Sequence, residues 1–182
     1  MVWSEVQVNR EQPLPDKRKG HTATLINGST MLVFGGLGWV EDPEADNSWG
    51  QTTKHINDAW KIDLSGADGL TWHAVHTAGD APSGREYHSS ALLSGRYLVV
   101  QGGYGHLTNF LNDTHVLDTW ADPMVWTRPV LSGAPPRSRH GSAFIDIGDN
   151  EILLFGGMGD AGTEDDVHIL VLGTGNEQYF GL

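Results

Sequence analysis

The fold is decided by a short, mainly apolar run that ends in two glycines, YLVVQGG at residues 97–103. The pattern occurs twice more, as MLVFGG at 31–36 and ILLFGG at 152–157. A run of consecutive apolar residues between turn signals is typical of a strand that is buried on both faces. Three such runs in one chain of 182 residues indicate an internal repeat, which has to be defined before any single element.

Each copy of the run stands between the same kinds of residue. An arginine and, three residues later, a histidine precede it, and an Asn-Asp or Asp-Asp pair follows it. We assign to the arginine and histidine positions Arg18 and His21, Arg85 and His88, and Arg137 and His140. The stretch from the glycine pair to the acid is 22 residues long in the first copy, against 10 and 9 in the others, so the first copy contains an insertion.

These positions together resemble the kelch repeat. Without the insertion the period is about 50–55 residues, which lies near the kelch period. The connecting segments 79–85 and 132–137 resemble the kelch subclass found in Rab-effector-like, host-cell-factor-like and plant acyl-CoA-binding proteins. The resemblance implies that each repeat forms four antiparallel strands, which make one blade of a β-propeller.

The expected fold is therefore all-β, with about three four-stranded, kelch-type β-propeller blades in a single domain, residues 1–182. In the first repeat the expected strands are 21–26, 31–34, 58–64 and 72–75. A tryptophan opens the fourth strand, and the candidates for this strand begin at Trp3, Trp72, Trp126 and Tyr179. The blade units are expected at about 1–71, 72–125 and 126–182.

Three blades form an open arc or half of a six-bladed ring, because propellers typically have about 4–8 blades. Two alternatives remain open. The chain is a segment of a longer propeller, or two chains form a homodimer that closes a six-bladed ring. In the second case the strand that begins at Trp3 completes the third blade of the partner.

The composition excludes several classes of partner. The chain has 23 acidic and 11 basic residues and a formal charge of −12, which disfavours binding to nucleic acid or to an anionic membrane. It has no cysteine, so disulfides, thiolate metal sites and cysteine nucleophiles are absent. No signal peptide and no apolar run of about 20 residues is visible, so we expect a soluble cytoplasmic protein.

A binding site is expected on one end of the blades. Strands alternate in direction, so the loops that enter each blade lie beside the loops between its second and third strands, 37–56, 104–111 and 158–164. Function concentrates in loops on a rigid scaffold. The candidate partner-binding residues on these loops are Arg18, Trp39, Trp49, Arg85, Tyr104, His106, Arg137 and Arg139.

Two of these assignments have structural alternatives. Trp39 and Trp49 either form an exposed hot spot for a partner or fold back onto the blade. The arginines that precede each blade either donate hydrogen bonds to turn carbonyls or form a positive ring for an acidic peptide.

The sequence contains no convincing catalytic or metal-binding motif. His21, His88 and His140 occupy a consensus position of the repeat and would lie far apart in an arc, so they are not expected to bind a metal. His115 and His168 match Trp60 and are expected to be packing positions. We therefore expect no cofactor, no metal and no enzymatic activity. The predicted function is a protein–protein interaction scaffold that binds a protein or peptide partner. The alternative is a kelch-type enzyme or small-molecule-binding propeller that uses polar groups at the channel mouth.

Overall fold

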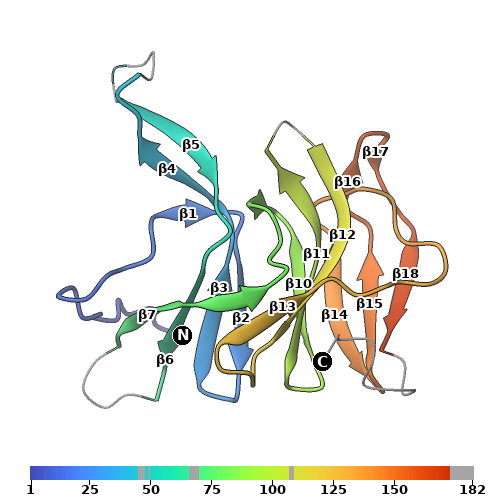
Figure 1. Ribbon diagram of the computed structural model, residues 1–182, viewed down its shortest axis with the longest axis horizontal. Coiled ribbons are helices and arrows are strands. Elements are labelled where there is room, and N and C mark those ends of the chain that lie inside the picture. The colour runs from blue at the N-terminus through green and yellow to red at the C-terminus, as the bar shows by residue number, and fades with distance from the viewer. Residues whose placement is uncertain (45–47, 49, 66–69, 107–108, 173–182) are drawn as a thin grey trace.

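The computed structural model describes residues 1–44, 48, 50–65, 70–106 and 109–172. All regular elements of these residues are β-strands, and the main sheets stand side by side (Figure 1). The expected all-β architecture is confirmed. No helix long and apolar enough to cross a membrane occurs among the described residues.

The first sheet contains the four strands predicted for the first repeat. Its order is β2 (Thr22–Ile26), β3 (Thr30–Phe34), β6 (Ala59–Asp63) and β7 (Trp72–Val75), and all neighbours are antiparallel. A tight turn at Asn27-Gly28, with φ of 42° and 80°, joins the first two strands. Such Asn-Gly turns require positive φ at both residues, which explains the sequence.

The second sheet repeats this order and adds a strand at its outer edge. Four antiparallel strands, β10 (Ser89–Leu93), β11 (Tyr97–Gly105), β12 (Asn109–Asp118) and β13 (Met124–Thr127), are followed by β8 (Thr77–Gly79). β8 pairs with β13 in parallel. Because β8 begins two residues after β7 ends, the outer strand of the first sheet continues along the outer edge of the second.

The third sheet contains β14 (Ala143–Gly148), β15 (Glu151–Phe155) and β18 (Val167–Val171) in the same antiparallel order. The candidate fourth strand at Tyr179 lies outside the described residues. The apolar run before each glycine pair forms β3, β11 or β15, and this strand is the second one in all three sheets.

The sheets pack face to face through apolar side chains. The first strands are neighbours, with β10 between β2 and β14 (Figure 1). Phe34 of the first sheet and Trp126 of the second are both buried, with ring centroids 5.0 Å apart. A second apolar cluster, which includes Val99 and Ile152, joins the second sheet to the third. Each interface therefore uses strands from both neighbouring repeats.

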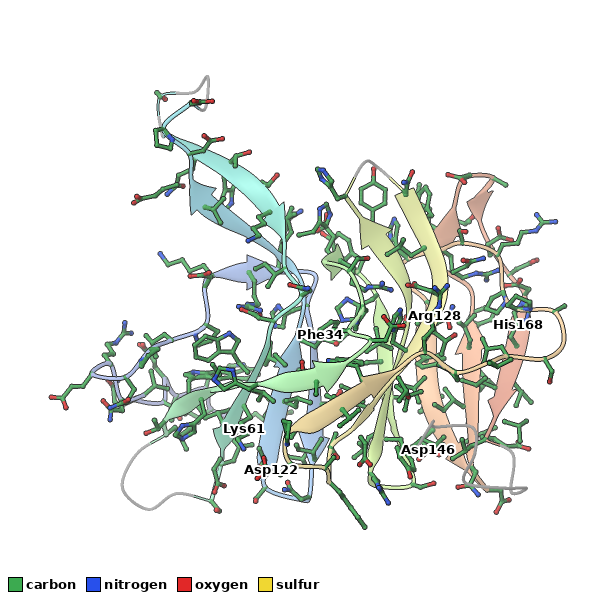
Figure 2. All side chains as sticks on the ribbon, in the orientation of Figure 1. Phe34, Lys61, Asp122, Arg128, Asp146 and His168 are labelled. Atoms are coloured by element: carbon green, nitrogen blue, oxygen red, sulfur yellow. The ribbon has the colours of Figure 1, made fainter. Side chains whose placement is uncertain are left out.

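Short strands extend from one end of the three sheets. The insertion in the first repeat forms a hairpin, β4 (Leu37–Glu41) and β5 (Gln51–His55), and β1 (Arg18–Lys19) pairs with β4. β9 (Arg85–Glu86) pairs with the end of β11, and β16 (Met158–Gly159) pairs with β17 (Gly162–Thr163). We call this end, formed by β1, β4, β5, β9, β16, β17 and the adjoining ends of β11 and β12, the hairpin face. Asp122 and Asp146 lie at the opposite end (Figure 2).

The second glycine of each pair allows the entering segment to approach closely. Gly36, Gly103 and Gly157 have φ of 103°, 107° and 107°, a region that side chains disfavour. A Cβ atom at Gly36 would lie 2.8 Å from the carbonyl oxygen of Lys19. The repeated glycine is therefore needed where two backbones meet at the hairpin face.

Candidate functional site

Three arginine clamps hold the hairpin face together. The side chain of Arg85 is fully buried; Nε donates to the carbonyl of Ser83 at 3.0 Å, and Nη1 donates to the carbonyl of Gly102 at 3.0 Å. Both terminal nitrogens also donate to the carboxylate of Asp113, at 2.7 and 2.9 Å. The clamp joins the entering segment, the glycine pair and the third strand. A bidentate, charge-assisted pair of this kind is geometrically specific.

The same clamp is present in the other two repeats. Arg18 bonds the carbonyls of Asp16 and Gly35 and the carboxylate of Asp58. Arg139 bonds the carbonyls of Arg137 and Gly156 and the carboxylate of Asp166. Of the two alternatives for these arginines, hydrogen bonds to turn carbonyls are observed for Arg18 and Arg85. Their positive charge is neutralised by the aspartates.

The third repeat corrects our alignment of the sequence. Arg139, rather than Arg137, occupies the clamp, and the separation from arginine to glycine carbonyl is 17 residues in all three repeats. The backbone N–H of Gly36 donates to the carbonyl of Arg85, and that of Gly103 donates to the carbonyl of Arg139. Arg139 thus has the same backbone partner as Arg85, the second glycine of the preceding repeat. The third repeat is therefore shifted by two residues, and Ser142 rather than His140 takes the histidine position. The sequence signal was present, since His140 stood 16 residues before its glycine pair, against 14 in the other copies.

Each clamp aspartate also contacts a ring nitrogen from the third strand. Trp60 Nε1 donates to Asp58 at 2.9 Å, and Nε2 of His115 and of His168 lies 3.1 and 2.9 Å from Asp113 and Asp166. The predicted equivalence of the three ring positions is confirmed. Burial would raise the pKa of Asp113, but hydrogen bonds from Arg85 and His115 outweigh it, and the pKa lies well below the usual range.

A cluster of aromatic, histidine and acidic side chains lies on the hairpin face. We call it the Glu86 cluster. Glu86 faces Tyr104 across β9 and β11, and Tyr104 faces Phe110 across β11 and β12. The ring of His140, which follows the third clamp arginine, stacks on Phe110 with centroids 5.3 Å apart and planes 7° apart. The other members are Tyr87, next to Glu86, and His55 from β5.

Glu86 is the charged centre of this cluster. It is only 6% exposed, and its carboxylate lies 3.4 Å from the ammonium of Lys19 and 3.7 Å from Nε2 of His55. Lys19 of β1 and His55 of β5 both pair with Leu37 of β4, so they lie in one cross-strand row of this sheet. Residues from all three repeats therefore meet around one buried carboxylate.

In the part of the chain that the structure describes, most of the buried side-chain polar atoms that lack a hydrogen-bond partner belong to the Glu86 cluster. Among the described residues, the buried side-chain atoms without a hydrogen-bond partner are His55 Nε2, Glu86 Oε2, His88 Nδ1 and His140 Nδ1. Three of these four belong to the cluster. A buried polar atom without a partner costs about 1–3 kcal/mol and therefore requires an explanation. A ligand that bonds to these atoms is one such explanation.

The charge states of the cluster follow from its burial. Burial lowers the pKa of His55 below its usual value, although the negative charge of Glu86 opposes this shift. The pKa of Lys19 is raised, mainly by the charge of Glu86. At neutral pH the cluster therefore contains a neutral His55 and a protonated Lys19.

A second polar surface lies beside the first strands of the sheets. Residues of all three repeats line a cavity of about 320 Å³ there, among them His21, Tyr87, His88, Ser89 and Ser142. Thr22 Oγ1 lies 2.8 Å from Nε2 of His88. Burial and the nearby Arg85 lower the pKa of His88 to about 3. Among the described residues, no group of three or more His, Asp or Glu side chains has the arrangement of a metal site.

The structure separates the predicted site residues into two groups. Trp39 is 56% exposed on β4, and His106 and Arg137 are exposed as well, while Tyr104 is half-buried in the Glu86 cluster. Arg85 and Arg139 are buried in clamps, and Arg18 is nearly so. Trp49 lies outside the described residues. Sequence reasoning missed Glu86, His55 and Phe110, because nothing in the repeat pattern marks these positions.

Comparisons with known proteins agree with the repeat architecture. The profile of the KLHDC2/KLHL20/DRC7 Kelch-repeats domain matches residues 1–178. The chain is 36% identical over 160 residues to Adagio protein 3 of Arabidopsis thaliana, which covers 88% of this chain and 23% of the relative. It is 32% identical over 167 residues to Acyl-CoA-binding domain-containing protein 4 of the same plant, with coverage of 92% and 22%. The chain thus spans less than a quarter of the length of these relatives.

A solved structure with the same fold supports this assignment. The structure of YjhT matches with a TM-score of 0.56 and 16% sequence identity, over 88% of this chain and 45% of that one. At this identity the match shows the fold alone. The profile match and the repeated clamps together lead to one conclusion: the chain belongs to the kelch-repeat family.

Proposed function

We propose that this kelch domain is a protein-interaction module that binds a protein or peptide partner through the hairpin face. The observation that carries the proposal is the Glu86 cluster, in which three buried polar atoms without hydrogen-bond partners meet beside partly exposed aromatic rings. Kelch domains generally serve as interaction scaffolds, and aromatic side chains are enriched in the energetically dominant part of interfaces.

The side chains divide into contacting and supporting roles. Trp39, Tyr104, His106 and Arg137 supply accessible aromatic and polar groups. The clamps of Arg18, Arg85 and Arg139 fix the backbone on which these groups stand. A rigid support lowers the entropic cost of binding, because fewer segments are ordered when the partner arrives.

The test compares two exposed tryptophans at opposite ends of the sheets. Trp39 is on the hairpin face, and Trp120 is 67% exposed in the turn after β12 at the other end. Partners are cross-linked to the purified chain in cell extract, identified by mass spectrometry, and then measured as purified proteins. Trp39→Ala and Tyr104→Ala are expected to weaken the purified complex at least tenfold, whereas Trp120→Ala leaves it unchanged. Equal loss in Trp39→Ala and Trp120→Ala would place the interface elsewhere.

We also propose that a second copy of the chain covers the open side of the third sheet. The supporting observation is a repeated register. Thr77, five residues after Trp72, pairs in parallel with Met124, and Val8, five residues after Trp3, pairs in parallel with Leu70. Residues 3–6 therefore correspond to β7, yet Trp3 is fully exposed and these residues belong to no sheet among the described ones.

The N-terminal segment of one copy and the third sheet of another are thus both available for an association between copies. The N-terminal segment has the register of a fourth strand. The third sheet has an apolar face that no other described residues cover, with Phe155, Val167 and Ile169 half exposed. Light scattering at increasing protein concentration is expected to reach twice the chain mass, and Ile169→Lys is expected to keep the chain monomeric. A monomer at every concentration would exclude this association.

A further inference from the structure

We infer that the Glu86 cluster recognises a cationic side chain, arginine or lysine, of the partner, and that Lys19 occupies this position when no partner is bound. This inference rests on the proposed interaction function and names the chemistry of the partner at that site. Its basis is the geometry of one buried carboxylate, one exposed ammonium and the rings around them.

The first step is the acceptor. Glu86 is almost completely buried, and its Oε2 atom has no hydrogen-bond partner. A buried carboxylate binds a cation strongly, because a charge-assisted hydrogen bond replaces lost hydration. The unpaired Oε2 atom therefore has unused capacity for an N–H donor.

The second step is access. The ammonium of Lys19 approaches to 3.4 Å from Oε2, while the Lys19 side chain remains 62% exposed. A cation can therefore reach the carboxylate from solvent along the path that Lys19 takes. The contact is an ion pair without hydrogen-bond geometry, so Lys19 offsets the charge of Glu86 without satisfying Oε2 as an acceptor.

The third step is the aromatic wall. The Lys19 ammonium lies 5.6 Å from the centroid of the Tyr87 ring, within the range of a cation–π interaction. Tyr104, which pairs with Glu86 across β9 and β11, contacts Phe110 edge to face at 5.3 Å, and His140 contacts both rings. Rings around a carboxylate suit a guanidinium, which stacks on aromatic faces and donates in its own plane.

The fourth step is the balance of charge on the hairpin face. The three clamp arginines are already paired with Asp58, Asp113 and Asp166, so they offer no free positive ring to an acidic peptide. His55 stays neutral beside Glu86, so it does not repel a cation. The net charge of −12 favours the encounter with a basic partner over an acidic one.

Lys19 then acts as an internal competitor. Because its side chain is exposed and flexible, an incoming guanidinium displaces it at little structural cost. Removing the competing ammonium leaves Glu86 uncompensated and strengthens binding of an external cation. The two substitutions Glu86→Gln and Lys19→Ala therefore have opposite expected effects, which a purely structural role for these residues does not produce.

The experiment uses N-acetyl-arginine methylamide as the probe and its neutral citrulline analogue as the matched control. Binding to the intact chain is followed by ¹H–¹⁵N spectra, through the amide signals of residues 86, 87 and 104. The arginine probe is expected to shift these signals saturably and the citrulline probe is not. Glu86→Gln is expected to weaken the arginine probe about tenfold or more, and Lys19→Ala to strengthen it about threefold to tenfold.

Lys17→Ala is the control variant, because Lys17 is an exposed lysine of the same entering segment. It is expected to leave the affinity of the probe within about twofold, since the loss of one exposed charge is screened by salt. The N-acetyl-lysine methylamide probe, measured in parallel, ranks the two cationic side chains.

Three outcomes would overturn the inference. They are equal shifts with arginine and citrulline, unchanged affinity in Glu86→Gln, and no gain in Lys19→Ala over Lys17→Ala. Failure here is distinguishable from failure of the proposed function. If Trp39→Ala and Tyr104→Ala still weaken the purified partner complex, the hairpin face remains the interface and only the cationic recognition is excluded.

Discussion

The second and third sheets contain the same sequence pattern but bury it differently. In β11 of the second sheet, Leu98, Val99 and Val100 are all at most 2% exposed. In β15 of the third sheet, Ile152 and Leu154 are buried, but Phe155 is 49% exposed. The difference has a simple cause, because the second sheet has a neighbour on each side and the third has one among the described residues.

This comparison shows what a propeller repeat encodes. The apolar run is typical of a strand that is packed on both faces. The same run occurs whether or not a sheet lies on each side of the strand. The side of the third sheet that the described residues leave open is correspondingly apolar. Its exposed residues are Ile145, Ile147, Phe155, Val167, Ile169 and Val171. Patches of this kind mark interaction surfaces on soluble proteins.

The largest expected effect is the loss of stability when the clamp arginine is removed, and it differs between the second and third sheets. Arg85→Ala leaves Asp113 with its charge uncompensated and its side chain only 18% exposed, so we expect a loss of about 3–5 kcal/mol in the free energy of unfolding. Arg139→Ala leaves Asp166 with a 36% exposed side chain that water solvates, and about 1–3 kcal/mol is expected. Urea unfolding of both variants measures the difference. Equal losses would show that the environment of the aspartate does not matter.

A smaller effect is expected from the apolar positions of the third strands. Val116 in the second sheet and Ile169 in the third both stand three residues after the clamp aspartate. Val116 is buried and Ile169 is 54% exposed. Val116→Ala is expected to cost about 2 kcal/mol, from the lost burial of its methyl groups and the cavity left behind. Ile169→Ala is expected to stay within about 0.5 kcal/mol, as for other surface substitutions.

The reverse ranking would contradict the comparison in a specific way. If Ile169→Ala destabilises as much as Val116→Ala, and does so more strongly at higher protein concentration, the third sheet is covered in solution. Measuring both variants at two concentrations therefore also tests the association with a second copy.

Most of the fold could be predicted from the sequence, because the repeat supplies three copies of one set of signals. The four strands of the first sheet, Thr22–Ile26, Thr30–Phe34, Ala59–Asp63 and Trp72–Val75, lie within one or two residues of the predicted ranges. The predicted loop 37–56 instead contains a hairpin. Its strands β4 and β5 pair with each other, and β4 also pairs with β1. The sequence of this stretch gave no clear signal for these strands.

The candidate site could be predicted only in its location. The loops of the hairpin face follow from the direction of the strands, and Tyr104 follows from its place after a glycine pair. Glu86 occupies the position that holds Lys19 in the first repeat and His140 in the third, so the repeat pattern contains no signal for it. The site depends on the differences between repeats, whereas the fold depends on what they share.

The smallest expected effect concerns His88 and Ser142, which occupy equivalent positions in the second and third repeats. The folded pKa of His88 is about 3 and the ordinary value is about 6.5, so between these values the unfolded chain binds more protons than the folded chain. The contribution of neutral His88 to the free energy of unfolding is therefore fully present above about pH 6.5. It is lost as the pH falls, by about 1 kcal/mol between pH 6 and pH 5. Below pH 4 the depressed pKa of Asp113 adds a loss in the same direction.

His88→Ser makes the second repeat resemble the third at this position. We expect the variant to lose the His88 contribution to the pH dependence between pH 6 and pH 5, about 1 kcal/mol, and to keep the contributions of other histidines with lowered pKa, such as His55. Its stability at pH 7 falls because the edge contact of His88 with Phe34 is removed. Urea unfolding at pH 7, 6 and 5 provides the measurement, and His76→Ser at an exposed position is the control. If His88→Ser and the unaltered chain lose the same free energy between pH 6 and pH 5, the pKa of His88 is not lowered in the folded state. In that case the burial of His88 between the first and second sheets is weaker than the structure indicates, and the contrast between the repeats lies in packing alone.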